Sequence, residues 1–189
     1  MERIGLLAGA GKLPVECAKA AKLLGYEVYA VALLPETDAE LKECTADCQS
    51  ISIAHLDAVL NYLKEHQVSK VTMIGKVTKE LLFSGKVQPD ARMLKLIMEL
   101  PDRKDDTIMM MFVRELAKAG IQAFDQTALI RRLMPHRGVI TKREPTAEER
   151  KDMEFGFRMA KEIGRLDVGQ TAVVKNMAVM ALEAIEGTD

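Results

Sequence analysis

The sequence predicts an α/β fold in which an open parallel β-sheet carries helices on both faces. Short, continuous apolar runs alternate with segments in which apolar residues recur at helical spacing, and glycine-containing turns separate the two. The chain has 189 residues, of which 48% are apolar, so it can bury a core of the size that one or two domains need.

The chain opens with a predicted strand–helix–strand unit. Residues 4–8 form a buried apolar run that ends in a turn at residues 9–11. Residues 13–24 have helical periodicity, with Pro14 in the first turn, where proline is tolerated. Residues 26–34 are a second apolar run, rich in Val, Tyr and Ala. Because two parallel strands need a crossover connection, this βαβ unit predicts a Rossmann-like topology.

The same alternation continues along the next part of the chain. The expected elements are a strand at 49–53, a helix at 55–66, a strand at 70–74, helices at 91–100 and 105–119, and a short strand at 121–124. Asp105 or Asp106 is the expected cap of the helix at 105–119, and Gly120 follows the end of that helix.

A polar stretch at residues 135–149 predicts a loop and a change of domain. Thr146 is the expected cap of a helix over residues 147–163, which Gly164 would stop. Residues 171–185 fit a strand or a helix equally well. We therefore expect a Rossmann-like N-terminal domain at residues 1–140 and the start of an α/β C-terminal domain at residues 141–189.

Composition argues against several classes of protein. There are 27 Lys and Arg against 28 Asp and Glu, which gives a net charge of −1 and no overall attraction to nucleic acid, although a local basic patch stays open. The chain has five Phe, three Tyr and no Trp, so stacking platforms for single-stranded nucleic acid are not expected. Residues 8–10 match the A-x-A pattern of a signal-peptide cleavage site, but the apolar run before them is short and the first three residues carry no net positive charge. The cysteines are sparse and lack zinc-ligand spacing, and no apolar run is long enough to span a membrane, so we expect a soluble, cytoplasmic protein.

The turn formed by Gly9, Ala10 and Gly11 is the first candidate site. Backbone N–H groups at such a turn, next to a helix N-terminus, can bind a phosphate. A nicotinamide site is disfavoured because Pro14 stands where the dinucleotide fingerprint has a third glycine, and no acid ends the second strand. A site for another phosphorylated ligand and a purely structural turn both stay open.

Lys76 and Thr78 follow the fourth strand, in the segment Gly-Lys-Val-Thr. Because the carboxyl ends of parallel strands share one edge of a sheet, we expect this loop beside the Gly9 turn, facing a cleft between the domains. A Lys and a Thr there suit a diphosphate. The alternative is an ordinary solvated loop.

Two further groups of polar residues are candidates. The pair Asp105–Asp106 could hold Mg²⁺ or Mn²⁺, although capping of a helix is favoured from the pair alone. The polar side chains of the last segment could face a cleft or could belong to an exposed chain end. They are Asp167, Gln170, Lys175, Glu183, Glu186, Thr188 and Asp189.

Five segments together resemble the LpxI-type UDP-2,3-diacylglucosamine pyrophosphatase family of bacterial lipid A biosynthesis. They are IGLLAGAGKLP at 4–14, GKVT at 75–78, KDD at 104–106, EIGRLDVGQ at 162–170 and EAIEGTD at 183–189. Lys104 stands where the family often has glycine. Asn176–Met177 stands where the family often has Asn-Gly in an apparent hairpin turn.

The resemblance implies hydrolysis of UDP-2,3-diacylglucosamine to UMP and 2,3-diacylglucosamine 1-phosphate, assisted by Mg²⁺ or Mn²⁺. The implied catalytic residues are Asp105, Asp106 and Lys76, and the implied metal ligands are Asp105, Asp106, Glu183 and Asp189. The implied substrate-binding residues are Gly9, Ala10, Gly11, Lys76, Thr78, Gln170, Lys175, Glu186, Gly187 and Thr188.

The resemblance also bears on partners and on length. It implies a UDP-diacylglucosamine-type lipid substrate, allows a homodimer and peripheral contact with the inner membrane, and implies no nucleic acid. The family continues beyond the position of Asp189, so we expect the 189-residue chain to have little or no activity alone. The alternative function is a non-catalytic nucleotide- or lipid-binding protein.

Overall fold

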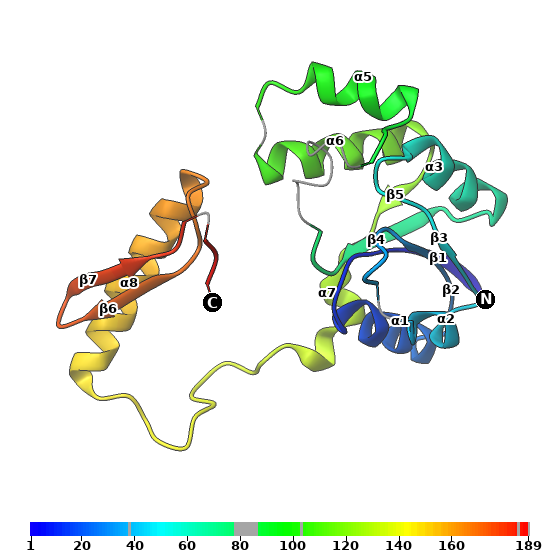
Figure 1. The fold of residues 1–189 in the computed structure, drawn as a ribbon. Coiled ribbons are helices and arrows are strands. Elements are labelled where there is room, and N and C mark those ends of the chain that lie inside the picture. Colours follow the sequence, from blue (N-terminus) through cyan, green and yellow to red (C-terminus); the bar gives the residue numbers. More distant parts are fainter. Residues whose placement is uncertain (38, 78–86, 103, 185, 189) are drawn as a thin grey trace. The chain divides into compact units, whose positions relative to one another are not determined.

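Two units of structure follow one another along the chain, Met1–Met134 and Pro135–Asp189. The structure is a computed structural model, and it describes residues 1–37, 39–77, 87–102, 104–184 and 186–188. Each unit has a β-sheet of its own, with five strands in the first and two in the second (Figure 1). Among the described residues, no helix is long and apolar enough to cross a membrane.

The sheet of the first unit is parallel throughout, with the strand order β3-β2-β1-β4-β5. Its strands are β1 (Glu2–Ala8), β2 (Tyr26–Ala32), β3 (Asp47–Ser50), β4 (Lys70–Ile74) and β5 (Gln122–Ala123). The chain builds outward from β1 on one side and then returns to build outward from β4 on the other. This order places the topological switch point between β1 and β4, and it confirms the Rossmann-like α/β fold.

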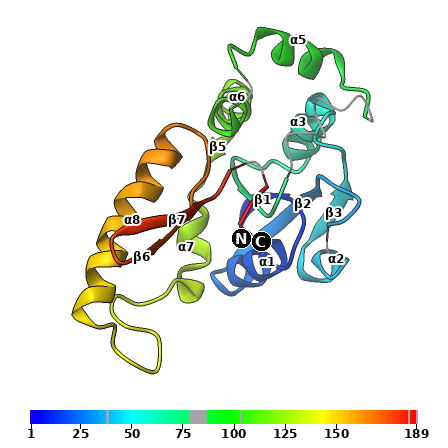
Figure 2. The same cartoon turned by 60° about the vertical axis from the view of Figure 1, so that its left-hand side comes forward.

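Helices cover both faces of this sheet (Figure 1 and Figure 2). Their bounds are α1 (Leu13–Leu23), α2 (Leu41–Cys44), α3 (Leu56–Glu65), α5 (Ala91–Glu99), α6 (Asp105–Lys118) and α7 (Gln126–Leu129). The core against α1 and α7 includes Ile4 and Leu6 of β1, whereas the core against α3 and α6 includes Leu7. Alternate residues of one strand thus fill two cores, because successive side chains point to opposite faces.

The third strand starts two residues earlier and ends three residues earlier than the sequence predicts. The expectation at residues 49–53 followed the apolar pair Ile51 and Ile53, but β3 ends at Ser50 and both isoleucines are buried in the segment that follows. Strand β3 lies at one edge of the sheet, and β2 is its one partner among the described strands. An edge strand tolerates polar, exposed side chains, so its apolar pattern was a poor guide.

The second unit consists of helix α8 (Ala147–Arg165) and the hairpin of β6 (Ala172–Lys175) and β7 (Ala178–Leu182). Thr146 caps α8 as predicted: its hydroxyl accepts the N–H of Glu149, whose carboxylate accepts the N–H of Thr146. The hairpin is a separate sheet and does not extend the first one.

Helix α8 does not stop at Gly164, so that prediction is wrong. The helix runs on to Arg165, and the residue with left-handed backbone after it is Asp167, at φ 59°. The N–H groups of Asp167 and Val168 donate to the carbonyls of Gly164 and Ile163, which closes the last turn. Aspartate tolerates the left-handed region better than most residues, so glycine was not required at the end.

Candidate functional site

The loops that follow β1 and β4 are joined to each other at the carboxyl edge of the first sheet. Ala10 and Lys76 exchange two backbone hydrogen bonds, of 2.9 Å from Ala10 N to Lys76 O and 3.0 Å from Lys76 N to Ala10 O. The N–H of Gly9 donates to the carbonyl of Ile74 at 2.9 Å. The expectation that both loops share one sheet edge is confirmed for these residues, whereas Thr78 lies outside the described residues.

Glycine is required where these two loops touch. A Cβ atom on Gly9 would lie 2.7 Å from the carbonyl oxygen of Lys76, and one on Gly75 would lie 2.8 Å from the carbonyl carbon of Gly9. Gly75 also has φ +101°, a conformation that side chains rarely adopt. The close approach of two backbones at the switch point therefore depends on both glycines.

These hydrogen bonds limit what the Gly9 turn can offer a ligand. The N–H groups of Gly9 and Ala10 already donate to backbone carbonyls, so they are not free donors for a phosphate. Gly11 forms a β-bridge with Thr37, so the backbone at the end of the turn is also paired with another segment. The ammonium of Lys76 lies at this edge and is exposed, and no described residue forms an ion pair with it.

Helix α6 begins with Asp105 and Asp106, which are its first two residues and not its N-cap, and the side chain of Asp105 lies outside what the structure describes. The N-cap is Lys104, which has an extended backbone and makes no side-chain capping bond, so the capping expectation is wrong. The side-chain hydrogen bond from Thr107, and then the N–H of Lys104, which donates to the Asp102 carboxylate at 3.0 Å, lower the pKa of Asp102. Two acids in a first turn are favoured by the helix dipole without being caps.

The topology brings the start of α6 to the same sheet edge as Lys76. Helix α6 leads into β5, which is parallel to β4, so α6 runs against the strands and its N-terminus lies toward their carboxyl ends. Asp106 is exposed there. The carboxyl edge thus gathers Lys76, the Gly9 turn and the first turn of α6 in one unit.

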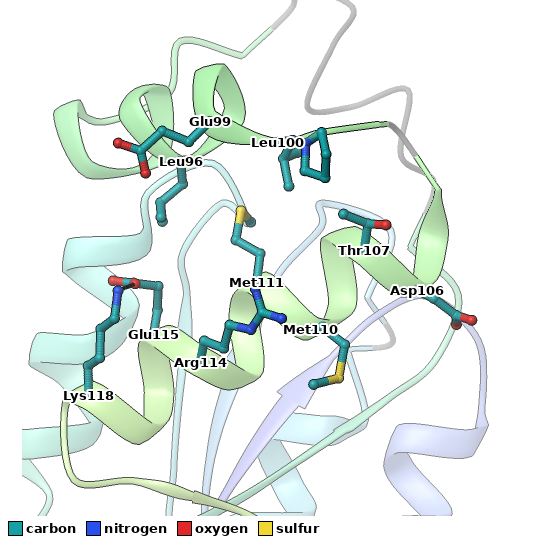
Figure 3. Close-up of a pocket in the computed structure, with 11 residues that line it drawn as sticks. Leu96, Glu99, Leu100, Asp106, Thr107, Met110, Met111, Arg114, Glu115 and Lys118 are labelled. Carbon is teal, nitrogen blue, oxygen red and sulfur yellow. Dashed lines mark hydrogen bonds and ion pairs between the residues drawn. The ribbon is translucent and has the colours of Figure 1, made fainter.

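A pocket of about 470 Å³ lies between α5 and α6, with Asp106 at one end and the ion pair of Glu115 and Lys118 at the other (Figure 3). Its lining residues are Leu96, Glu99, Leu100, Pro101, Asp106, Thr107, Met110, Met111, Arg114, Glu115 and Lys118. This size is usual for ligand pockets. The residues from α6 recur at helical spacing along one face of that helix, which is the sequence signal that could have found the pocket.

An ion-pair network around the buried carboxylate of Glu115 joins these helices. Glu115, whose side chain is 5% exposed, accepts from Lys118 at 2.6 Å and from Arg92 at 3.0 Å, and Arg92 also reaches Asp57 of α3 at 2.6 Å. Lys118 and then Arg92 lower the pKa of Glu115 against the opposing effect of burial. Arg92 therefore connects α3, α5 and α6 around one side of the pocket.

In the second unit, Glu183 brings several of the candidate residues together. Its carboxylate accepts the N–H of Gln170 at 2.9 Å and the hydroxyl of Thr188 at 2.8 Å. The Gln170 bond and then the Thr188 bond lower the pKa of Glu183. Glu186 accepts the N–H of Ala184 at 3.1 Å, and Gly187 has φ +84°. Glu183 organises this segment through hydrogen bonds to its neighbours, and Asp189 lies outside the described residues.

Lys175 does not join that group. It lies at the far end of β6, next to the hairpin turn, whereas Gln170 and Glu183 lie at the open end of the hairpin. Asp152 of α8 accepts the N–H groups of Asn176 and Met177 at 2.8 and 2.6 Å, which ties the turn to the helix. No local sequence signal points to Asp152, because its partners lie more than twenty residues away.

The carboxylate oxygens of Asp105 and Asp106 are ligands of the kind that a hard cation such as Mg²⁺ prefers. Asp105 and Asp106 are consecutive carboxylates, and Mg²⁺ is commonly held by one or two carboxylates together with substrate phosphates. Within the described part of the chain, no group of three or more His, Cys, Asp or Glu side chains could hold an ion by itself. The pair therefore fits an ion that arrives with, or is completed by, a phosphorylated ligand.

Two family models match the chain in consecutive ranges. The LpxI N-terminal domain matches residues 3–133, and the LpxI C-terminal domain matches residues 136–189. A curated relative, "UDP-2,3-diacylglucosamine pyrophosphatase LpxI" of Caulobacter vibrioides, is 31% identical over 192 residues. That alignment covers 100% of this chain and 67% of the relative.

Solved structures align with parts of the chain. A UDP-glucose-4-epimerase from Stenotrophomonas maltophila, with bound NAD and formylated UDP-arabinopyranose, aligns at 16% identity and a TM-score of 0.42 over 65% of this chain and 35% of that one. An N5-carboxyaminoimidazole synthetase from Staphylococcus aureus aligns at 18% identity and a TM-score of 0.35 over 63% of this chain and 30% of that one.

Proposed function

The chain belongs to the LpxI family, and from this membership we propose that it serves the hydrolysis of UDP-2,3-diacylglucosamine to UMP and 2,3-diacylglucosamine 1-phosphate. The observation that carries the proposal is the match of both LpxI domain models, in order, along the whole chain. The chain spans 67% of the length of its curated relative, so the activity is proposed for the protein that carries this sequence.

We propose that the diphosphate of the substrate lies at the carboxyl edge of the first sheet. Ligands of open α/β sheets bind at the switch point, which here lies between β1 and β4. Lys76 supplies a cation there that no described residue neutralises. A lysine in that place binds phosphoryl oxygens and stabilises the negative charge that develops on them during hydrolysis.

Asp105 and Asp106 are the proposed holders of Mg²⁺ or Mn²⁺, at the first turn of α6. Such an ion neutralises the diphosphate and makes a bound water more acidic. The exposed position of Asp106 at the sheet edge supports this role. Glu183 and Asp189 stay proposed ligands, although the carboxylate of Glu183 already serves Gln170 and Thr188.

The second unit is proposed to contribute substrate contacts through Gln170, Lys175, Glu186, Gly187 and Thr188. Gln170 and Thr188 share the carboxylate of Glu183, so these two would act together. Lys175 would act separately, from the other end of the hairpin. A cytoplasmic location and a homodimer stay proposals as well.

Calorimetry with UMP tests the proposed site directly. We expect UMP to bind the 189-residue chain and Lys76→Ala to weaken binding by about 1.5–3 kcal/mol, because a charge-assisted contact is lost. Lys22→Ala is the matched control, since Lys22 is an exposed lysine near the end of α1. Failure of UMP to bind, or equal weakening by both substitutions, would contradict the site.

A further inference from the structure

The stretch from residue 131 to residue 143 is strongly basic in a chain that is nearly neutral. It contains Arg131, Arg132, Arg137, Lys142 and Arg143 and no Asp or Glu. Its formal charge is therefore +5, whereas the whole chain carries −1. This basic segment runs from the 3₁₀ helix at Arg131–Leu133 through the loop that precedes α8.

Every residue of the basic segment is exposed. Large apolar side chains lie among the basic ones: Leu133 is 45% exposed, Met134 48%, Val139 40% and Ile140 77%. Solvent-facing apolar side chains interspersed with Lys and Arg suit a boundary that is apolar on one side and anionic on the other.

Local ion pairs leave most of this charge uncompensated. Arg143 forms a two-pronged ion pair with Glu149, and Arg132 lies 3.7 Å from Glu16. In the part of the chain that the structure describes, Arg131, Arg137 and Lys142 form no ion pair. A net charge of about +3 thus remains available to an external anion even after both pairs are counted.

We propose that the basic segment docks the protein on the surface of an anionic lipid bilayer. The inference rests on the proposed function, because a diacylated substrate resides in a membrane and must be reached from its surface. Clustered Lys and Arg are attracted to anionic headgroups, and exposed apolar side chains insert among them. Single-stranded nucleic acid fits less well, since the segment contains no Phe, Tyr or Trp for stacking.

Flotation of the 189-residue chain with lipid vesicles tests the docking surface. We expect binding to vesicles of phosphatidylcholine mixed with phosphatidylglycerol, little binding to phosphatidylcholine alone, and release at high salt. The double variant Arg137→Ala/Lys142→Ala should weaken binding roughly 10- to 30-fold, as expected for two surface cations. The control Lys22→Ala/Lys64→Ala removes the same charge from exposed positions on α1 and α3 and should bind like the parent chain.

A second pair of variants tests the apolar contribution. Ile140→Ser should weaken vesicle binding, whereas Leu23→Ser should not, although the two side chains are exposed to a similar extent, 77% and 74%. Equal binding to neutral and anionic vesicles, or equal loss in the double variant and its control, would overturn the proposal. Complete release by UMP would show a site for soluble phosphates instead.

The vesicles contain no UDP-2,3-diacylglucosamine, so the docking test is separate from the test of the proposed function. Vesicle binding by the 189-residue chain, together with no release of UMP from UDP-2,3-diacylglucosamine by the protein that carries this sequence, would contradict the proposed function and leave the docking surface standing. Hydrolysis of UDP-2,3-diacylglucosamine by a protein that does not bind anionic vesicles would support the proposed function and contradict the docking surface.

Discussion

Gly9 and Gly75 decide whether the two loops at the switch point can meet. The backbones of these residues approach so closely that a single added carbon on either would lie under 3 Å from backbone atoms. At Gly9 the requirement for glycine is steric, whereas at Gly75 the steric requirement is combined with a positive φ. The position of Lys76 beside the first turn therefore follows from two residues without side chains.

Alanine substitution at three glycines separates the cost of steric overlap from the cost of a positive φ. Gly120 has φ +79° and nothing lies within 4 Å of an added Cβ. Gly120→Ala should therefore lower the free energy of unfolding by about 1 kcal/mol, through backbone strain alone. Gly9→Ala should cost about 1–3 kcal/mol through steric overlap, and Gly75→Ala more than either. Urea unfolding followed by circular dichroism measures the order, and a Gly120→Ala loss as large as that of Gly75→Ala would contradict it.

Met177 occupies a hairpin-turn position that favours glycine. Asn176 and Met177 have φ of 52° and 60°, which is the requirement of a type I′ turn. We expect Met177→Gly to stabilise the hairpin by about 1 kcal/mol, because a non-glycine residue is strained in that region. Hydrogen exchange of the β6 and β7 amides should slow. Met180→Gly, within β7, should speed it, and slowing by Met180→Gly would contradict the explanation.

At the scale of elements, the start of α8 depends on charge. Arg143 and the N–H of Thr146 lower the pKa of Glu149 from 4.5 to about 2. Because the folded pKa is depressed, the stabilisation is complete above pH 4.5 and is lost as the pH falls toward about 2. Glu149→Gln should therefore remove part of the helicity loss that the parent chain shows across this interval in circular dichroism.

Glu148→Gln is the control for that titration, since Glu148 is the neighbouring acid of the first turn and is outside the Arg143 ion pair. The pH dependence of helicity in Glu148→Gln should resemble that of the parent chain. If both substitutions flatten it equally, the effect belongs to first-turn charge in general.

The sequence predicted the elements whose signals are local. Residues 4–8 of β1 are a short run without polar side chains that is buried on both faces of the sheet, and the capping box at Thr146 is complete within four residues. Signals that depend on tertiary position were missed or misplaced. Strand β3 is polar because it is an edge, and α8 continues past Gly164 because Asp167 takes the left-handed conformation.

The candidate site was predictable to the same extent. The Gly9 turn and Lys76 could be placed together because parallel strands share an edge, and the fold confirms this. That the N–H groups of the turn are used by the neighbouring loop could not be read from a motif. Neither could the joining of the hairpin turn to Asp152, which only the packed structure brings into contact.

At the scale of the whole molecule, the proposed activity draws on both units. In the proposal, Lys76 and the Asp105–Asp106 pair of the first unit would bind the diphosphate and the cation, and the residues around Glu183 in the second unit would add substrate contacts. Phosphoryl transfer depends chiefly on positioning and on charges that are already in place. An enzyme assembled in this way should lose turnover when a single carboxylate at the sheet edge is neutralised.

The most direct test is UMP release from UDP-2,3-diacylglucosamine by the protein that carries this sequence, with Mg²⁺ or Mn²⁺ present. We expect turnover in the parent and a loss of roughly 100-fold or more in Asp106→Asn. The control Glu65→Gln, which neutralises an exposed acid at the end of α3, should keep the parent rate. Absence of UMP release by the parent, or equal rates in the parent and Asp106→Asn, would contradict the account.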